Sequence, residues 1–221
     1  MHQHKKHTVT VTTSWDDGHV KDLVLAELLD KYDIAGTFYI SPENREIQTK
    51  DRLSSQVVRE MARHFEIGAH TMTHPHLTKV PLTQAQHEIV DSKKYLEEVT
   101  GTPISSFCYP AGYYSDALKQ VVKNAGFTVA RTVGQGSRYV LDPLAMRTTV
   151  HARTHRWHFF MPWDELAILM FERVYKTGGI FHLWGHSWEI DAHEEWHRLE
   201  RVLKHISGRK DVGYHSNRQL V

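Results

Sequence analysis

The sequence predicts an α/β fold, and within that class a (β/α) barrel of seven or eight strands in a single domain. Short β-prone runs alternate with helical patterns of about 10 to 15 residues, which is typical of parallel βαβ units. Seven or eight such units fit in the 221 residues. An open, doubly wound sheet is the competing architecture. Two acidic residues, however, follow the first strand, where dinucleotide-binding folds carry a glycine-rich turn.

The first half of the chain supplies three strands and two helices. Residues 8–15 alternate between apolar and polar and predict a strand, and 36–40 (GTFYI) and 66–70 (EIGAH) are further β-prone runs. Residues 20–33 and 54–65 place apolar side chains at helical spacing.

The second half continues the alternation. Its best-defined helix begins near Thr83 and Gln86, which have the spacing of a capping box, and ends at Gly101, a typical C-terminal stop. The remaining elements are expected as strands near 106–109, 127–133, 147–151, 180–186 and 212–215, and as helices at 115–125, 164–176 and 194–206.

Composition excludes several classes of function. The formal net charge of +1 gives no reason to expect nucleic acid or an anionic membrane as a partner. No stretch approaches the length of about 18 apolar residues that a membrane span needs. The single cysteine, Cys108, rules out an internal disulfide.

The N-terminal residues MHQHKKHTVTV carry charge but no apolar core, so they do not resemble a secretory signal. We expect residues 1–8 to form a flexible tail and residues 9–221 to form the folded domain. The expected localisation is cytoplasmic, or secreted if the chain begins after a removed signal. Because the chain has 18 histidines, spacing has to identify the few with a chemical role.

Polar residues gather where predicted strands end. Asp16 and Asp17 end the first strand, His70 ends EIGAH, the turn YPAG at 109–112 follows its strand, and His186 ends IFHLWGH. The carboxyl ends of barrel strands form the face where active sites are built. These segments are therefore expected to converge on one rim.

The run HTMTH suggests that this rim holds a metal. Pro75 follows directly and disfavours a helix at His74, so His70 and His74 are expected at a strand end and in the loop after it. Two histidines and one carboxylate leave room for water, which suits a catalytic zinc or related divalent ion rather than a closed structural site. Of the two adjacent acids, one would bind the metal and the other would act as a base.

The chain resembles the polysaccharide deacetylases of carbohydrate esterase family four. The resemblance rests on SWDDG (14–18), GTFYI (36–40), EIGAHTMTH (66–74), FCYPAG (107–112) and LWGH (183–186), and it covers about residues 9 to 190. It implies a distorted (β/α) barrel that forms the catalytic domain and removes N- or O-acetyl groups from sugars with a divalent metal, most simply Zn²⁺.

The resemblance also implies residue roles. Asp16 would be the general base, and Asp17, His70 and His74 would bind the metal. The backbone N–H of Ala111 would stabilise the oxyanion, and His186 would protonate the leaving group.

The sequence departs from the family pattern in two motifs. Cys108 stands where the family usually has an arginine that orients the base, so Arg131, Arg147 or Arg153 is expected to supply that donor. The last motif places His182, Trp184 and His186 on one face of its strand, which makes His182 the alternative acid. Glu189 either polarises His186 or is simply solvated.

Three aromatic residues are expected to bind sugar: Tyr113, Trp163 and Trp188. The predicted partner is an acetylated sugar or oligosaccharide, and the predicted activity is removal of acetyl groups from N-acetylated sugars. One alternative is an amide or cyclic-imide hydrolase that uses the same site on a small molecule. Another is a sugar-binding module without activity. The sequence does not predict the oligomeric state.

Overall fold

Eight strands form one curled parallel sheet in the computed structural model, which describes residues 8–153 and 161–221. The strands are β1 Val9–Asp17, β2 Gly36–Ile40, β3 Glu66–Ala69, β4 Ser106–Cys108, β5 Val129–Arg131, β6 Val150–His151, β7 Gly179–Gly185 and β8 Val212–Tyr214. Their order is β5-β4-β3-β2-β1-β7-β6, and β8 pairs with the first part of β1. The sheet is therefore built outward from β1.

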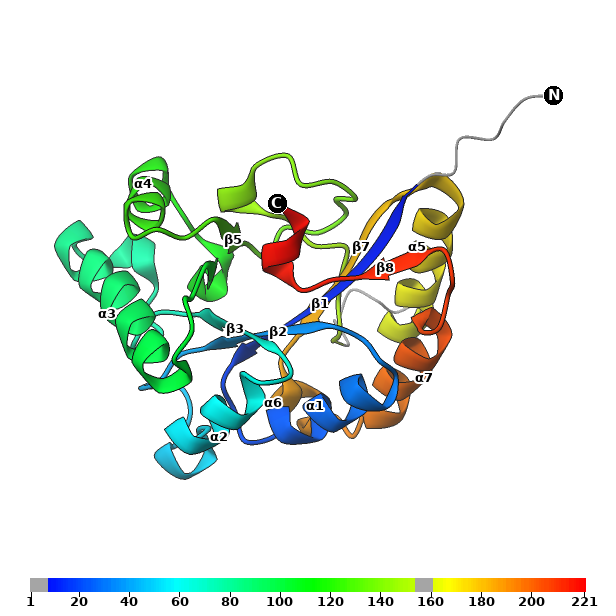
Figure 1. Ribbon diagram of the computed structural model, residues 1–221, viewed down its shortest axis with the longest axis horizontal. Helices are drawn as coiled ribbons and strands as arrows, with labels where there is room; N and C mark the ends of the chain where they lie inside the picture. The colour runs from blue at the N-terminus through cyan, green and yellow to red at the C-terminus, as the bar shows by residue number, and fades with distance from the viewer. Residues whose placement is uncertain (1–7, 154–160) are drawn as a thin grey trace.

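Helices surround the sheet (Figure 1). The α-helices are α1 Asp22–Lys31, α2 Ser55–Met61, α3 Leu82–Thr100, α4 Asp116–Asn124, α5 Trp163–Thr177, α6 Ser187–Ala192 and α7 Trp196–Ile206. Short 3₁₀ turns are η1 Thr49–Asp51, η2 Leu77–Lys79, η3 Pro110–Gly112, η4 Pro143–Ala145 and η5 Asn217–Leu220.

The two end strands of the sheet, β5 and β6, curl toward each other. Arg131 of β5 forms a parallel bridge with Met146, which lies only a few residues before β6. This partial closure, with helices around the outside, is a distorted (β/α) barrel, so the barrel prediction is confirmed and the doubly wound alternative is not.

The two faces of β1 explain why the interior of the sheet is polar. Val11 and Trp15 belong to the buried apolar core that the helices cover. Thr12, Ser14 and Asp16 alternate with them and point to the other face, where they are equally buried. On that inner face, side chains of β1 interact with residues of other elements. Asp16 is the last of these side chains, at the carboxyl end of the strand.

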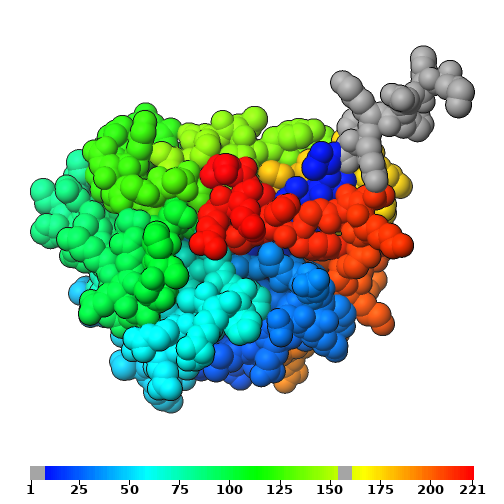
Figure 2. All heavy atoms as spheres, viewed as in Figure 1, coloured from blue at the N-terminus to red at the C-terminus, as the bar shows by residue number. Residues whose placement is uncertain are grey.

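The C-terminal segment closes the amino-terminal end of the sheet. Asn217 accepts a hydrogen bond from Thr12 Oγ1 at 2.9 Å and donates one to the hydroxyl of Tyr39 at 2.9 Å. In Figure 2 this segment, in red, fills the middle of the face shown, between the green and orange parts of the chain. The opposite, carboxyl-terminal end of the strands is left for the site.

Several element predictions need correction. The capping box at Thr83 and Gln86 is wrong, because α3 begins at Leu82 after Pro81 and has no side-chain cap. The stop at Gly101 is confirmed by its left-handed conformation, with φ 68°. Helix α6 was not predicted. Residues 1–7 of the expected tail lie outside the described residues. Thr8, its last residue, is held to the sheet, because its carbonyl accepts a hydrogen bond from Gly179 N at 3.0 Å.

No helix in the described part of the chain has both the length and the hydropathy needed to cross a membrane.

Candidate metal and catalytic site

Asp16 and Asp17 leave β1 at the carboxyl end of the sheet, and both are almost fully buried, at 3% and 5% exposure. Asp17 has a left-handed backbone, with φ 86°, and Gly18 follows with φ 74°. A Cβ on Gly18 would lie 3.0 Å from Ile40 Cγ2, so glycine suits this turn both in conformation and in space. The turn therefore requires a glycine at position 18, which explains why the two acids are followed by glycine in the motif DDG.

Asp17, His70 and His74 come together in space. Oδ1 of Asp17 lies 3.7 Å from Nε2 of His70 and 3.4 Å from Nε2 of His74, and the three ligand atoms lie within 4.8 Å of one another. Tetrahedral ligands with bonds of about 2.0 to 2.2 Å to zinc are about 3.3 to 3.6 Å apart. The donor set and its spacing therefore fit a divalent ion of this size.

His70 is held in the form that a metal requires. Its Nδ1–H donates to the carbonyl of Cys108 at 2.8 Å, which leaves the lone pair on Nε2, the nitrogen that faces Asp17. Burial lowers the pKa of His70 to about 4, so the ring is neutral at physiological pH. A ligating histidine whose other nitrogen donates to a carbonyl is typical of metal sites.

The loop after β3 presents His74 through a fixed backbone. Both Thr71 and His74 have positive φ, at 67° and 61°. Thr71 Oγ1 accepts from the N–H of His74 at 3.1 Å, and Thr73 bonds to the carboxylate of Glu88 through both its N–H and its hydroxyl, at 2.8 and 2.7 Å. Backbone strain held in this way is characteristic of functional sites.

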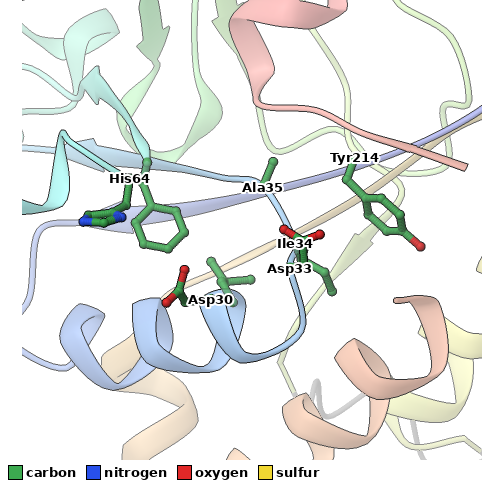
Figure 3. Close-up of a pocket in the computed structure, with 8 residues that line it drawn as sticks. Asp30, Asp33, Ile34, Ala35, His64 and Tyr214 are labelled. Carbon is green, nitrogen blue, oxygen red and sulfur yellow. The ribbon is translucent and has the colours of Figure 1, made fainter. Parts of the chain in front are cut away.

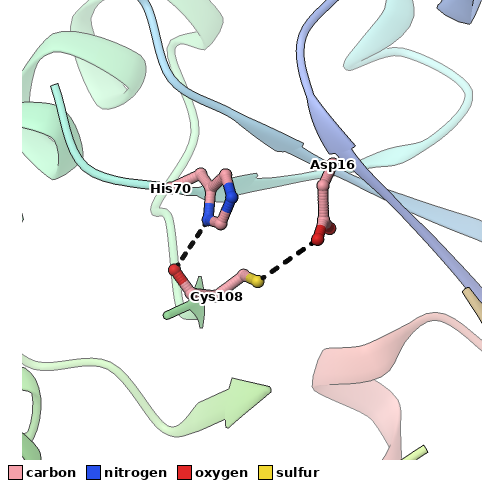
Figure 4. Close-up of side chains that lie close together, drawn as sticks. All are labelled: Asp16, His70 and Cys108. Atoms are coloured by element: carbon pink, nitrogen blue, oxygen red, sulfur yellow. Dashed lines mark hydrogen bonds between the residues drawn. The ribbon is translucent and has the colours of Figure 1, made fainter. Parts of the chain in front are cut away.

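Asp16 pairs with Arg131, although its carboxylate also lies within 4.8 Å of a His70 nitrogen and of the Cys108 thiol, which form a second candidate ligand group. A terminal nitrogen of the Arg131 guanidinium bonds to Oδ2 of Asp16 and lies 2.9 Å from Sγ of Cys108. Burial alone would raise the pKa of Asp16, but the positive charges of Arg131 and His186 lower it to about 2. Figure 4 shows Asp16, Cys108 and His70 around this space, with the Cys108 thiol directed at Asp16.

The arginine expected beside Asp16 therefore comes from β5. Of the three candidates, Arg131 contacts Asp16, Arg147 donates to the carbonyl of Gln135, and Arg153 pairs with Glu189. Cys108 is fully buried against the Arg131 guanidinium, so its small side chain provides the room that Arg131 occupies.

His186 lies at the rim of β7 and faces both acids. Its Nε2 is 4.0 Å from Asp16 Oδ2 and 3.9 Å from Asp17 Oδ2. Its Nδ1–H donates to Glu189 Oε2 at 2.7 Å, so Glu189 is a buried partner of the ring and is not solvated. Burial opposes the charged ring, but Glu189 and the two aspartates raise the pKa of His186 to about 9.

His182 shares the inner face of β7 but lies deeper. It is buried, forms a 2.8 Å hydrogen bond between its Nε2 and Ser14 Oγ, and has its pKa lowered to about 3 by burial and by the charge of Arg131. A ring that is neutral at physiological pH and distant from the rim is a poor proton donor, which favours His186 as the acid.

The aromatic residues expected to bind sugar divide into two groups. Trp163 is 0% exposed and donates its indole N–H to Glu195 at 2.9 Å, so its assignment to a sugar groove is wrong. Its place in the first turn of α5 gave no indication that it turns inward. Tyr113, 57% exposed, stacks on His76, and Trp188, 37% exposed, donates to Asp17 Oδ2 at 2.8 Å.

Ala111 lies in η3, directly after β4, with φ 53°. Gly112 follows with φ 74°, and a Cβ there would lie 2.4 Å from Val133 Cγ2. The turn is therefore closely packed. The expected role of the Ala111 N–H toward an oxyanion stays a prediction.

Sequence reasoning missed two buried groups that support the site. Asn44 donates to Asp17 Oδ1 at 3.4 Å, and Asp22 accepts from Ser187 Oγ at 2.5 Å, which ties α1 to α6 beside His186. Neither has a recognisable spacing, because each acts through a contact between distant segments.

Two cavities lie at opposite ends of the sheet. One of about 280 Å³ adjoins Asp17 and is also lined by Glu46, Asp51 and Trp188. The other, of about 400 Å³, lies at the amino ends of β2 and β3, where Asp33, Ala35 and Tyr214 line it (Figure 3). Only the first opens at the face where barrel enzymes carry their chemistry.

The fold and the site together define a (β/α) barrel with a candidate divalent-metal centre at the carboxyl ends of its strands. A sequence profile described as polysaccharide deacetylase matches residues 3–130, more than half of the chain. The chain belongs to the polysaccharide deacetylase family.

Individual relatives agree with this assignment. A peptidoglycan-N-acetylglucosamine deacetylase of Bacillus cereus is 29% identical over 119 residues, which are 53% of this chain and 53% of that protein. The chain spans about half the length of the curated relatives it matches.

Solved structures share the fold. A Mycobacterium smegmatis protein assigned as a polysaccharide deacetylase superposes with a TM-score of 0.75 at 16% identity, covering 99% of this chain and 91% of that one. A family 4 acetyl xylan esterase of Clostridium thermocellum, solved with a cobalt ion, gives a TM-score of 0.63 at 16% identity, covering 96% and 89%.

Proposed function

We propose that this protein is a metal-dependent hydrolase that removes acetyl groups from N-acetylated sugars. The observation that carries the proposal is the pair of adjacent acids in unequal surroundings. Asp17 faces His70 and His74, whereas Asp16 pairs with Arg131, and His186 faces both acids. Family membership, the relative that acts on peptidoglycan N-acetylglucosamine and the structure solved with cobalt support both the activity and the metal.

Asp17, His70 and His74 would hold the divalent ion, which we expect to be Zn²⁺. When bound, such an ion acts as a Lewis acid and makes a hydroxide nucleophile available near neutral pH. Asp16 is ionised at neutral pH, so its carboxylate can accept the proton of the attacking water. Arg131 keeps the carboxylate oriented while it does so.

His186 would protonate the leaving amine. Its raised pKa of about 9 keeps the ring protonated at neutral pH, and Glu189 fixes the nitrogen that does not face the site. The backbone N–H of Ala111 would donate to the oxyanion of the tetrahedral intermediate. Tyr113 and Trp188 would contact the sugar.

The direct test is acetate release. We expect the purified protein to release acetate from N-acetylglucosamine oligomers, to lose this activity on chelation and to regain it with added zinc. Peptidoglycan fragments and acetylxylan, assayed in parallel, would identify the preferred acceptor. Ammonia release from small amides or cyclic imides would favour the alternative hydrolase. Sugar binding without any product would indicate an inactive module.

A second prediction separates the two histidines of β7. His186→Ala should lower turnover by about 10² to 10⁴ while bound metal is retained, because general acid catalysis is worth about that much. His182→Ala should lose much less, since its ring is buried away from the rim. Turnover and zinc content of both variants decide the assignment. The larger loss in His182→Ala would reverse the two roles.

A further inference from the structure

Trp188 makes a contact that its expected role toward sugar does not explain. It is the second residue of α6, two positions after His186, and its indole N–H donates to Oδ2 of Asp17 at 2.8 Å. Part of the ring remains exposed in the cavity of about 280 Å³. The residue thus reaches the candidate metal ligand from α6, a different element from the β3 loop that carries the histidines.

The two oxygens of Asp17 have different surroundings. Oδ1 faces Nε2 of His70 and Nε2 of His74, at 3.7 and 3.4 Å, and accepts a long hydrogen bond from Asn44 at 3.4 Å. Oδ2 bonds to Trp188, and the Nε2 of His186 is 3.9 Å away. Because a carboxylate turns about its Cβ–Cγ bond, holding Oδ2 also fixes the direction of Oδ1.

We propose that Trp188 is a positioning residue for the metal ligand Asp17. Its N–H holds Oδ2, so that Oδ1 stays directed at His70 and His74, where the metal would bind. This inference rests on the proposed function, because it assumes that Asp17, His70 and His74 bind a metal. Removing a residue that is hydrogen-bonded to a metal ligand typically lowers metal affinity by about 10- to 100-fold.

The first turn of α6 supports this role, because its three residues are each tied to the site. Ser187 donates to the buried Asp22 at 2.5 Å, and Glu189 accepts from His186 at 2.7 Å. Trp188 lies between these two anchors in the chain. The backbone that carries the indole is therefore held on both sides, which makes the N–H a fixed donor and not a chance contact of a surface ring.

The test is the zinc affinity of Trp188→Phe, measured by competition with a chromophoric chelator. Phenylalanine keeps an aromatic ring but removes the N–H donor. Trp196→Phe is a matched control, because the indole of Trp196 donates to Asp191 at 3.0 Å and neither residue belongs to the candidate metal set. We expect zinc to bind Trp188→Phe about 10- to 100-fold more weakly than the parent protein, and Trp196→Phe within about 2-fold of it.

The measurement uses affinity, so a loss of sugar stacking on the same ring does not enter the result. Trp188→Leu serves as a second variant without a donor, and circular dichroism verifies that each variant is folded. Unchanged affinity in both Trp188 variants overturns the inference while leaving the proposed function in place. An equal loss in Trp196→Phe assigns the effect to the fold and also overturns it. Absence of zinc binding by the parent protein overturns the proposed function itself.

Discussion

Asp16→Asn is expected to keep its zinc and lose most of its turnover, whereas Asp17→Asn is expected to lose zinc. Asp17 presents Oδ1 to His70 and His74, and an amide is a much weaker ligand than a carboxylate. Asp16 contacts Arg131 and the Cys108 thiol instead, so its loss would remove the proposed base and none of the three proposed ligands. Turnover in Asp16→Asn should fall by about 10² to 10⁴.

Zinc content and kcat of both variants test this division. Added zinc should restore part of the activity of Asp17→Asn and none of that of Asp16→Asn. Equal metal loss in the two variants would mean that both acids are ligands. A fully active Asp16→Asn would exclude it as the base. Because Asp16→Asn also removes the charge beside a buried arginine, thermal unfolding of each variant is needed to separate folding from catalysis.

The local parts of this site could be predicted from the sequence. Asp17, His70 and His74 lie at strand ends whose positions follow from apolar periodicity, and parallel strands bring their carboxyl ends together. The helix stop at Gly101 and the strand at GTFYI were likewise predicted from local preferences for turns and strands. In each case the determining interaction lies within a few residues of the feature.

What could not be predicted depends on contacts between distant segments. The partner of Asp16 is 115 positions away, and no local pattern distinguishes Arg131, which contacts it, from Arg147, which bonds to Gln135. Trp163 turns inward because Glu195, on a different segment, accepts its N–H. Helix α6 has six residues, which is too few to show a periodicity.

The buried position of Arg131 leads to the second large expected effect. Arg131→Met should lower both turnover and stability. The guanidinium is fully buried, bonds to Asp16 and lies over the ring of Trp184, with 4.5 Å between the guanidinium carbon and the ring centroid. Without it, burial raises the pKa of Asp16 and the carboxylate loses its fixed orientation. Removing one partner of a buried ion pair typically costs about 3 to 5 kcal/mol of unfolding free energy, because the other charge stays buried.

Two comparisons make this prediction specific to the ion pair. Arg147→Met changes an exposed arginine whose one hydrogen bond among the described residues is to a backbone carbonyl, so it should be near normal in turnover and in unfolding. The double variant Asp16→Asn/Arg131→Met should be more stable than Arg131→Met alone, because it no longer buries an unpaired carboxylate. Urea unfolding of the metal-free proteins and kcat of the zinc-loaded single variants provide the measurements. If the double variant were as unstable as the sum of the two single losses, Arg131 would be needed for packing beside Trp184 and Cys108, and the orientation of the base would have another source.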